Sequence, residues 1–178
     1  MTDDLEYLKI GVSALTPIVT GIVGVLILRM GTRMEHSKNL HRELLKKRLD
    51  LFEEIAPKLN DVYCYFQALG HWSDLNPDEI ILRKRAIDRA FNVNRFLFDQ
   101  DVWTAYREFE KLHFDMYSAA GQAAKLRLDL DYVRLRVGEL FKNEWMPNVS
   151  QKGGDRDAQK AAYQTLMDAL GRSIVVSG

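Results

Sequence analysis

Residues 10–28 read IGVSALTPIVTGIVGVLIL and contain no ionisable side chain. At about 1.5 Å per residue, a helix of this length reaches roughly 28 Å, close to the bilayer hydrocarbon core of about 30 Å. The leader before it, MTDDLEYLK, is acidic, unlike the basic start of a secretory signal. The sequence therefore predicts a retained transmembrane helix over residues 10–30, after a short extracytoplasmic leader over residues 1–9.

The charges that flank this segment predict its orientation. Residues 29–48 contain seven Lys and Arg against two Glu, whereas the leader contains three acidic residues and one Lys. Positive charge accumulates on the cytoplasmic side of membrane proteins. We therefore expect a single-pass protein with its N-terminus outside and its remaining residues in the cytoplasm.

Small and hydroxyl-bearing residues recur along one face of the predicted span, at Ser13, Thr16, Pro17, Thr20 and Gly24. Such a face lets helices approach closely, and hydroxyl groups can bond across the contact or line water. Three interpretations stay open: a monomeric anchor, a packing face in a homo-oligomer, and the lining of a pore made by several copies.

In a pore, two arginines would lie at the cytoplasmic mouth. Arg29 and Arg33 follow the apolar run directly. Repeated around an oligomer, they would form cationic rings, which favour anions.

The chain after the span has helical periodicity. Apolar residues three and four apart form one seam: Leu45, Leu49, Phe52, Ile55, Leu59, Val62 and Phe66. Pro57 interrupts this helix and predicts either a kink or a division near Ala56. Asn76 as N-cap, Pro77 at N1 and Glu79 at N3 predict a second helix from Pro77 to about Asn92.

Three further helices are expected. One begins near Gln100, with Asp99 as its cap and an apolar stripe that ends at Met116. Another runs from about Gln122 to Lys142, and the last from about Arg156 to Leu170, with Gly171 as its C-cap. The predicted fold is all-α: one transmembrane helix, then a four- or five-helix cytoplasmic bundle over residues 31–171 and a short tail over residues 172–178.

Composition and motifs exclude several classes of function. The 178 residues contain 25 Lys and Arg against 25 Asp and Glu, so the chain is not a globally basic nucleic-acid binder. A single cysteine, Cys64, cannot form an internal disulfide, and we expect it to be a small buried hydrophobic side chain. P-loop, GxGxxG, GxSxG and HExxH motifs are absent from the sequence. We expect no enzyme activity, no catalytic residues, no cofactor and no metal.

One pattern points to chemistry. Arg107 and His113 in REFEKLH match the loose Arg-x4-6-His pattern of the HEPN ribonucleases. The arginine would stabilise charge on a phosphate, and the histidine would transfer a proton. A hydrogen-bonded histidine in the core is the competing interpretation, because His113 lies beside the apolar stripe.

Clustered basic residues are the candidate ligand site. The predicted group is Arg83, Lys84, Arg85, Arg89 and Arg95, with Phe91, Phe96 and Phe98 nearby; Arg127, Arg134 and Arg136 form a second group. Arginines with interleaved aromatic rings can serve phosphates and stacked bases together. A solvated charged face is the alternative.

The layout of the chain resembles a known family. An acidic leader, one span and the helical continuation HSKNLHRELLKKRLDLFEEIAPKLNDVYCYF over residues 36–66 are similar to the small membrane effectors of bacterial anti-phage abortive-infection systems, above all the channel-forming effector of the Hailong system. The resemblance implies a tetrameric, ion-channel-like complex in the inner membrane. It also implies that single-stranded oligonucleotides from a partner nucleotidyltransferase-like enzyme keep the channel closed. Loss of that ligand would open the channel and depolarise the membrane.

Three hypotheses for the function therefore follow from the sequence. The first is an oligomeric channel effector gated by a cytoplasmic ligand. The second is a membrane-tethered helical adaptor without a pore. The third is a tethered HEPN-like ribonuclease.

Overall fold

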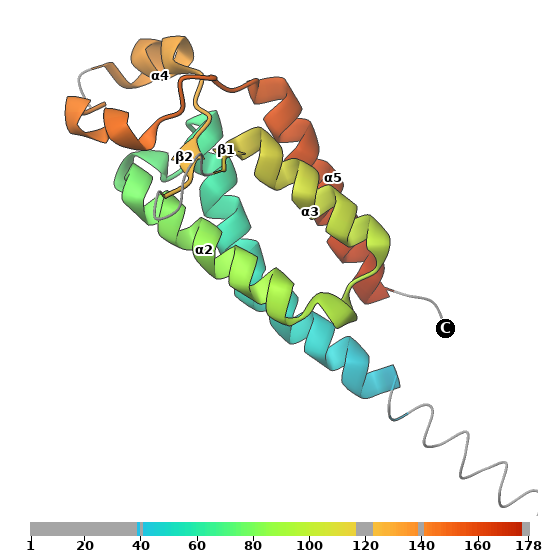
Figure 1. The fold of residues 1–178 in the computed structure, drawn as a ribbon. Coiled ribbons are helices and arrows are strands. Elements are labelled where there is room, and N and C mark those ends of the chain that lie inside the picture. Colours follow the sequence, from blue (N-terminus) through green and yellow to red (C-terminus); the bar gives the residue numbers. More distant parts are fainter. Residues whose placement is uncertain (1–38, 40, 117–122, 139–140, 176–178) are drawn as a thin grey trace, which may run out of the picture. The chain divides into compact units, whose positions relative to one another are not determined.

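The computed structural model describes residues 39, 41–116, 123–138 and 141–175 (Figure 1). The chain divides into two units, Met1–Leu45 and Lys46–Gly178. In the first unit, residues 41–45 are helical. The second unit is mostly helical where it is described, which confirms the predicted helical class.

The predicted span lies outside the described residues. This applies to residues 10–30 and so to Ser13, Thr16, Pro17, Thr20, Gly24, Arg29 and Arg33. Among the helices that the structure does describe, none combines the length and apolar character that a bilayer crossing requires.

The second unit begins with a helix over residues 46–67. It continues with η1 (Trp72–Asp74), α2 (Pro77–Val93), η2 (Arg95–Leu97), α3 (Gln100–His113), β1 (Phe114–Asp115), β2 (Lys125–Leu126), α4 (Leu130–Val137), η4 (Asn143–Asn148) and α5 (Arg156–Val175). Helices α3 and α5 pack against each other and are visible side by side in Figure 1.

The first helix of this unit is continuous across Pro57. Proline removes one helical hydrogen bond, but Pro57 and Glu53 are both exposed, so water can reach the carbonyl group that loses its donor. Of the two alternatives predicted at Pro57, a division of the helix near Ala56 is therefore excluded. Of the predicted seam, Ile55, Leu59, Val62 and Phe66 are buried, whereas Leu49 is exposed.

Helix α2 begins where its capping residues predict. The Asn76 side chain accepts a hydrogen bond from the Glu79 amide at 3.0 Å, and the Glu79 carboxylate accepts one from the Asn76 amide at 2.9 Å. Pro77 stands at the first helical position. These reciprocal bonds satisfy two amides that the helix itself leaves without partners.

We expect Asn76→Ala to lower the free energy of unfolding by about 1 kcal/mol, because the Glu79 amide loses its acceptor. Urea denaturation followed by circular dichroism measures the change. Arg85→Ala, on the exposed middle of the same helix, is the matched control and should change stability by less than about 0.5 kcal/mol. Equal stability of the two variants would contradict the capping role.

The predicted helix over residues 122–142 is largely wrong. Lys125 and Leu126 instead form β2, which pairs antiparallel with β1, and helix α4 begins only at Leu130. Backbone bonds to distant residues replace helical ones here: the Arg127 amide donates to the His113 carbonyl at 2.9 Å, and the Ser150 amide donates to the Leu126 carbonyl at 2.8 Å. Local periodicity carries no information on such pairing.

Two helix ends also differ from prediction. Helix α3 ends at His113, so Met116 lies beyond it and is exposed. Helix α5 continues to Val175, so Gly171 is inside the helix and most of the predicted tail is helical. Asp99 holds the N-cap position of α3 but makes no capping hydrogen bond; it lies 3.6 Å from Arg48.

A close backbone approach joins β2 to the segment before α5. A Cβ atom at Gly154 would lie 1.9 Å from the Arg127 carbonyl oxygen, which no real contact allows. Glycine at this position lets the chain before α5 lie against the residue that follows β2. Arg127, at this contact, and Lys152, two residues before Gly154, both line one surface hollow.

Candidate functional site

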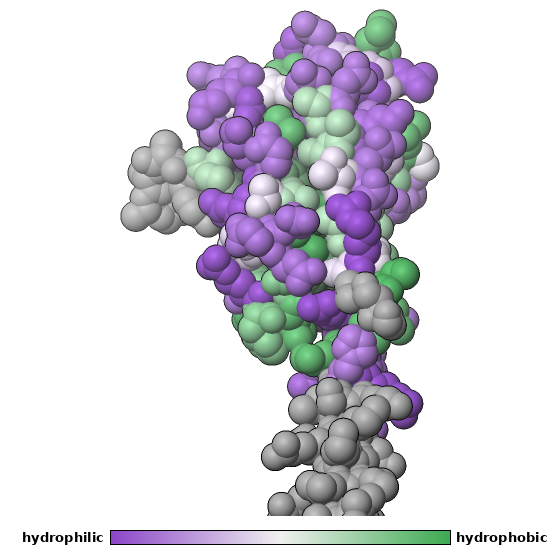
Figure 2. Space-filling view, turned by 90° about the vertical axis from the view of Figure 1, so that its right-hand side faces the viewer, coloured by the Kyte–Doolittle hydropathy of each residue, from purple (hydrophilic) through white to green (hydrophobic). Residues whose placement is uncertain are grey.

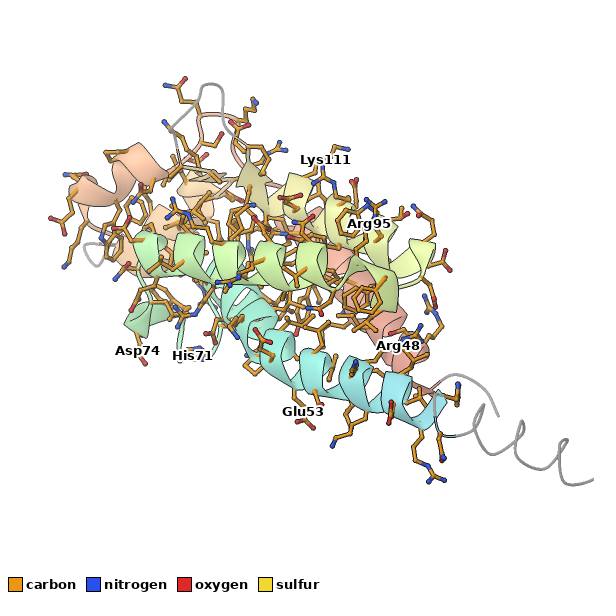
Figure 3. All side chains as sticks on the ribbon, turned by 60° about the horizontal axis from the view of Figure 1, so that its bottom comes forward. Arg48, Glu53, His71, Asp74, Arg95 and Lys111 are labelled. Carbon is orange, nitrogen blue, oxygen red and sulfur yellow. The ribbon has the colours of Figure 1, made fainter. Side chains whose placement is uncertain are left out.

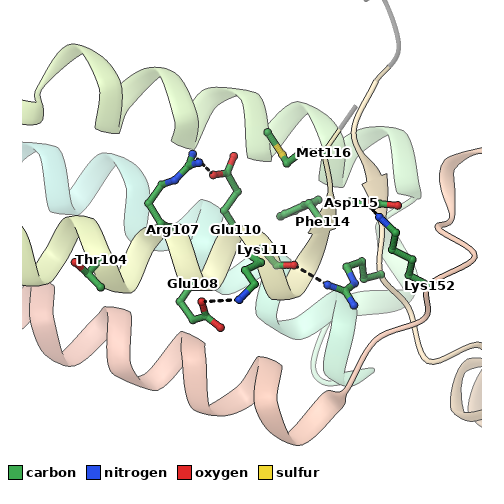
Figure 4. Close-up of a pocket in the computed structure, with 10 residues that line it drawn as sticks. Thr104, Arg107, Glu108, Glu110, Lys111, Phe114, Asp115, Met116 and Lys152 are labelled. Carbon is green, nitrogen blue, oxygen red and sulfur yellow. Dashed lines mark hydrogen bonds and ion pairs between the residues drawn. The ribbon is translucent and has the colours of Figure 1, made fainter. Parts of the chain in front are cut away.

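A surface hollow of about 510 Å³ lies where α3, the β1–β2 pair and the segment before α5 meet (Figure 4). Its lining combines cationic, anionic and apolar side chains: Thr104, Arg107, Glu108, Glu110, Lys111, Phe114, Asp115, Met116, Arg127 and Lys152. The hollow is therefore assembled from segments that are far apart in the sequence.

Glu110 forms the deep polar part of this hollow. Its carboxylate accepts from Arg107 Nη1 at 2.7 Å on the surface side and from Lys84 Nζ at 2.9 Å on the interior side. Lys84 also donates to Asp88 at 2.6 Å, and Asp88 accepts from the Tyr106 hydroxyl. Burial, with the negative charge of Asp88, raises the pKa of Tyr106, so this hydroxyl stays a hydrogen-bond donor.

Asp115 is held at the other side of the hollow. It accepts from Lys152 Nζ at 2.7 Å and from the Ser150 hydroxyl at 2.8 Å. The bond from Lys152, followed by the bond from Ser150, holds the pKa of Asp115 below its ordinary value. Asp115 is thus an ionised partner for Lys152 at neutral pH.

Arg127 differs from the other cations of the lining. Its Nε donates to the Gly153 carbonyl at 3.1 Å and its Nη1 to the Lys111 carbonyl at 3.0 Å. Both acceptors are neutral, so these bonds orient the guanidinium group without balancing its charge. A fixed guanidinium group is well suited to a carboxylate or a phosphate.

Two apolar side chains in the lining give the hollow a hydrophobic surface beside its charged groups. Phe114 is buried and Met116 is exposed, and Figure 4 shows both between the Arg107–Glu110 pair and Asp115. An anion that carries a flat or apolar portion can therefore contact Arg127 and this surface together. The geometry fits a small phosphorylated or carboxylated ligand.

The predicted basic group does not form one surface. Lys84 is only 3% exposed and is held by Asp88 and Glu110. Arg83 pairs with Asp61, while Arg85 and Arg89 are exposed. Arg95 is also exposed and lies over the Trp103 ring, with its guanidinium carbon 4.6 Å from the ring centre. Ligand binding by the exposed members stays a prediction.

Arg107 and His113 are not brought together. His113 is fully buried, donates from Nδ1 to the Phe109 carbonyl at 2.8 Å, and lies between the Phe66 and Phe109 rings. Arg107 is on the surface and pairs with Glu110. A phosphate that contacts Arg107 therefore has no path to the His113 imidazole in this arrangement, which favours the core-histidine interpretation.

The single cysteine has a definite place in the fold. Cys64 is buried, as expected, and burial raises the pKa of its thiol. Within the described part of the chain, no group of three His, Cys, Asp or Glu side chains is arranged to hold a metal ion.

Sequence reasoning missed most of the hollow. It placed Arg127 in a secondary basic group and gave no role to Lys111 or Lys152. The hollow depends on the hairpin and on the close approach at Gly154, and neither has a short sequence signal. Comparison of the chain with protein-family models, curated proteins and solved structures gives no significant match.

Proposed function

We propose that this chain is a membrane-anchored effector that works as a homo-oligomer, with an ion-conducting path formed by residues 10–30 of several copies. The helical unit binds an anionic ligand in the cytoplasm and keeps the path closed while the ligand is bound. Loss of the ligand opens the path and depolarises the bacterial inner membrane. Gating is then a population shift set by the different affinities of the two states for the ligand.

One observation carries the proposal: the uncharged run over residues 10–28, with its hydroxyl-bearing face and its cationic flank. A plain anchor has no need of Ser13, Thr16 and Thr20 on one face. Four copies and a role in anti-phage defence are proposed on the resemblance to the Hailong effector. A nucleotide-like ligand is proposed on the same resemblance and on the chemistry of the hollow.

The hollow supplies the ligand site of this proposal. Arg127, fixed by two neutral carbonyl groups, provides a phosphate contact, and Lys111 and Lys152 line the same hollow, where they pair with Glu108 and Asp115. A nucleobase or another flat group would lie on Phe114 and Met116. We therefore place the ligand here rather than on the arginines of α2.

Ion flux from liposomes that contain the full-length protein tests the proposal. We expect flux to rise after nuclease removes copurified oligonucleotide, and to fall to background in Thr16→Leu/Thr20→Leu, because leucine fills the hydroxyl-bearing face. Val19→Leu/Ile22→Leu, on the other side of the span, is the matched control and should conduct. Arg127→Gln should raise flux before nuclease treatment, because the ligand is held less tightly.

The same experiment separates the alternatives. Folded, inserted protein that conducts in neither state would support a tethered adaptor. Specific RNA cleavage that is lost in Arg107→Ala/His113→Ala would support the ribonuclease hypothesis.

A further inference from the structure

One end of the second unit carries large apolar side chains in water. Val93 at the end of α2 is 66% exposed, Phe96 in η2 is 76% exposed, and Val175 at the end of α5 is 80% exposed. On the face shown in Figure 2, hydrophobic residues gather near the lower end of the described unit. Exposed apolar groups concentrated at one place indicate a contact surface.

Arg48 shows that this is also the end at which the chain enters the unit. Its Nη1 donates to the Ser173 carbonyl near the end of α5 at 2.7 Å, and its Nη2 lies 3.6 Å from Asp99 at the start of α3. The part of this helix that belongs to the second unit therefore starts beside η2 and the end of α5. Figure 3 shows Arg48 and Arg95 at this end, away from His71 and Asp74.

Cationic side chains surround the apolar ones. Arg89 lies one helical turn before Val93, Arg95 precedes Phe96, and Arg172 lies one turn before Val175; all three are exposed. Asp99, an acidic residue nearby, is partly balanced by Arg48. We call these six residues, Arg89, Val93, Arg95, Phe96, Arg172 and Val175, the entry end.

We propose that the entry end contacts the headgroup layer of an anionic bilayer. Phe96 and Val93 enter the interfacial layer, and Arg89, Arg95 and Arg172 pair with lipid phosphates. Exposed apolar side chains beside guanidinium groups are typical of surfaces that lie on anionic membranes. This inference rests on the membrane anchoring proposed above, and it gives the arginines of α2 and η2 a lipid rather than an oligonucleotide.

The length of chain before Lys46 supports a bilayer as the occupant. The predicted span ends at Leu28, so 17 residues, from Arg29 to Leu45, connect it to the second unit. Because the chain enters the second unit at this end, the entry end is the part of the unit that lies closest along the chain to the predicted span.

An environment-sensitive fluorophore tests the contact in the full-length protein. Cys64→Ala removes the native thiol, and Phe96→Cys or Leu135→Cys then supplies one labelling site. Leu135 is 83% exposed, and its helix α4 lies at the opposite end of the second unit from the ends of α2 and α5 in Figure 1, so it is a matched control. We expect emission from position 96 to shift to the blue in phosphatidylglycerol vesicles, and emission from position 135 to stay that of a probe in water.

Further comparisons identify the occupant. Adding Arg89→Gln and Arg95→Gln to the protein labelled at position 96 should reduce the blue shift. Replacing the phosphatidylglycerol vesicles by zwitterionic vesicles should also reduce it. A shift of the same size in zwitterionic vesicles, unchanged by Arg89→Gln and Arg95→Gln, would show that lipid phosphates do not pair with these arginines and would overturn the inference. Equal emission from positions 96 and 135 would also overturn it.

Extraction with alkaline carbonate from the same vesicles separates this inference from the proposed anchoring. Protein that resists extraction and yet shows no shift at position 96 keeps its anchor and refutes the membrane contact. Protein that carbonate releases has no membrane span, and the inference then fails together with the proposed function.

Discussion

Lys84→Met is expected to lower the free energy of unfolding by about 3–5 kcal/mol, because it removes the buried cation that two carboxylates share. Lys84 is buried and donates to Asp88 at 2.6 Å and to Glu110 at 2.9 Å. Glu110 is itself buried and keeps only Arg107 as a cationic partner in the variant. Urea denaturation of the full-length protein in detergent, followed by circular dichroism, measures the loss.

The neighbouring arginine is the matched control for this prediction. Arg85→Met removes a charge of the same sign from the next residue, but Arg85 is exposed, so its loss should cost less than about 0.5 kcal/mol. Adding Glu110→Gln to Lys84→Met should recover part of the stability, because one stranded carboxylate is gone. Equal costs for Lys84→Met and Arg85→Met would refute the buried ion pair.

Acidification from pH 6.5 towards pH 4 is expected to destabilise the helical unit through His113. Burial lowers the pKa of His113 from 6.5 to about 4, while the bond to the Phe109 carbonyl acts weakly in the other direction. Between pH 6.5 and pH 4 the His113 imidazole is protonated in the unfolded chain but neutral in the folded protein. The free energy of unfolding therefore falls as the pH falls. The decrease in the free energy of unfolding that His113 causes approaches about 3 kcal/mol near pH 4 and is absent above pH 6.5.

His113→Asn isolates this contribution. Its amide can still donate to the Phe109 carbonyl but does not titrate. We expect the variant to be less stable than the wild type at pH 7.5 and to lose less stability on acidification to pH 5, as measured by urea denaturation at each pH. Parallel pH profiles for the two proteins would show that His113 is not the group responsible.

The parts of this fold that were predictable depend on neighbours in sequence. The start of α2 follows from Asn76, Pro77 and Glu79, which act within one turn. The β1–β2 pair was missed because it joins Phe114 to Leu126 and Asp115 to Lys125, across a gap that no local pattern spans. Helix periodicity predicted the interiors of α2, α3 and α5 correctly, but it failed at residues 125–129 and at the C-terminal ends of α3 and α5.

The candidate site illustrates the same limit. Lys84 and Arg85 are adjacent and similar in sequence, but only Lys84 faces Glu110 on α3, so one is an interior ion-pair partner and the other a solvated charge. The hollow could not be predicted because Arg127 and Lys152 reach it through the hairpin and the segment before α5. The transmembrane helix over residues 10–30 stays a prediction, because these residues lie outside the part of the chain that the structure describes.

The packing of α5 against α3 means that the core of the helical unit needs the C-terminal end of the chain. Leu166 and Leu170, both on α5, are fully buried, so the core cannot close until the last part of the protein has been synthesised. The apolar stretch over residues 10–28 leaves the ribosome long before that. A nascent chain therefore exposes its apolar N-terminal stretch while its helical unit is still incomplete, so the membrane insertion proposed above would precede folding.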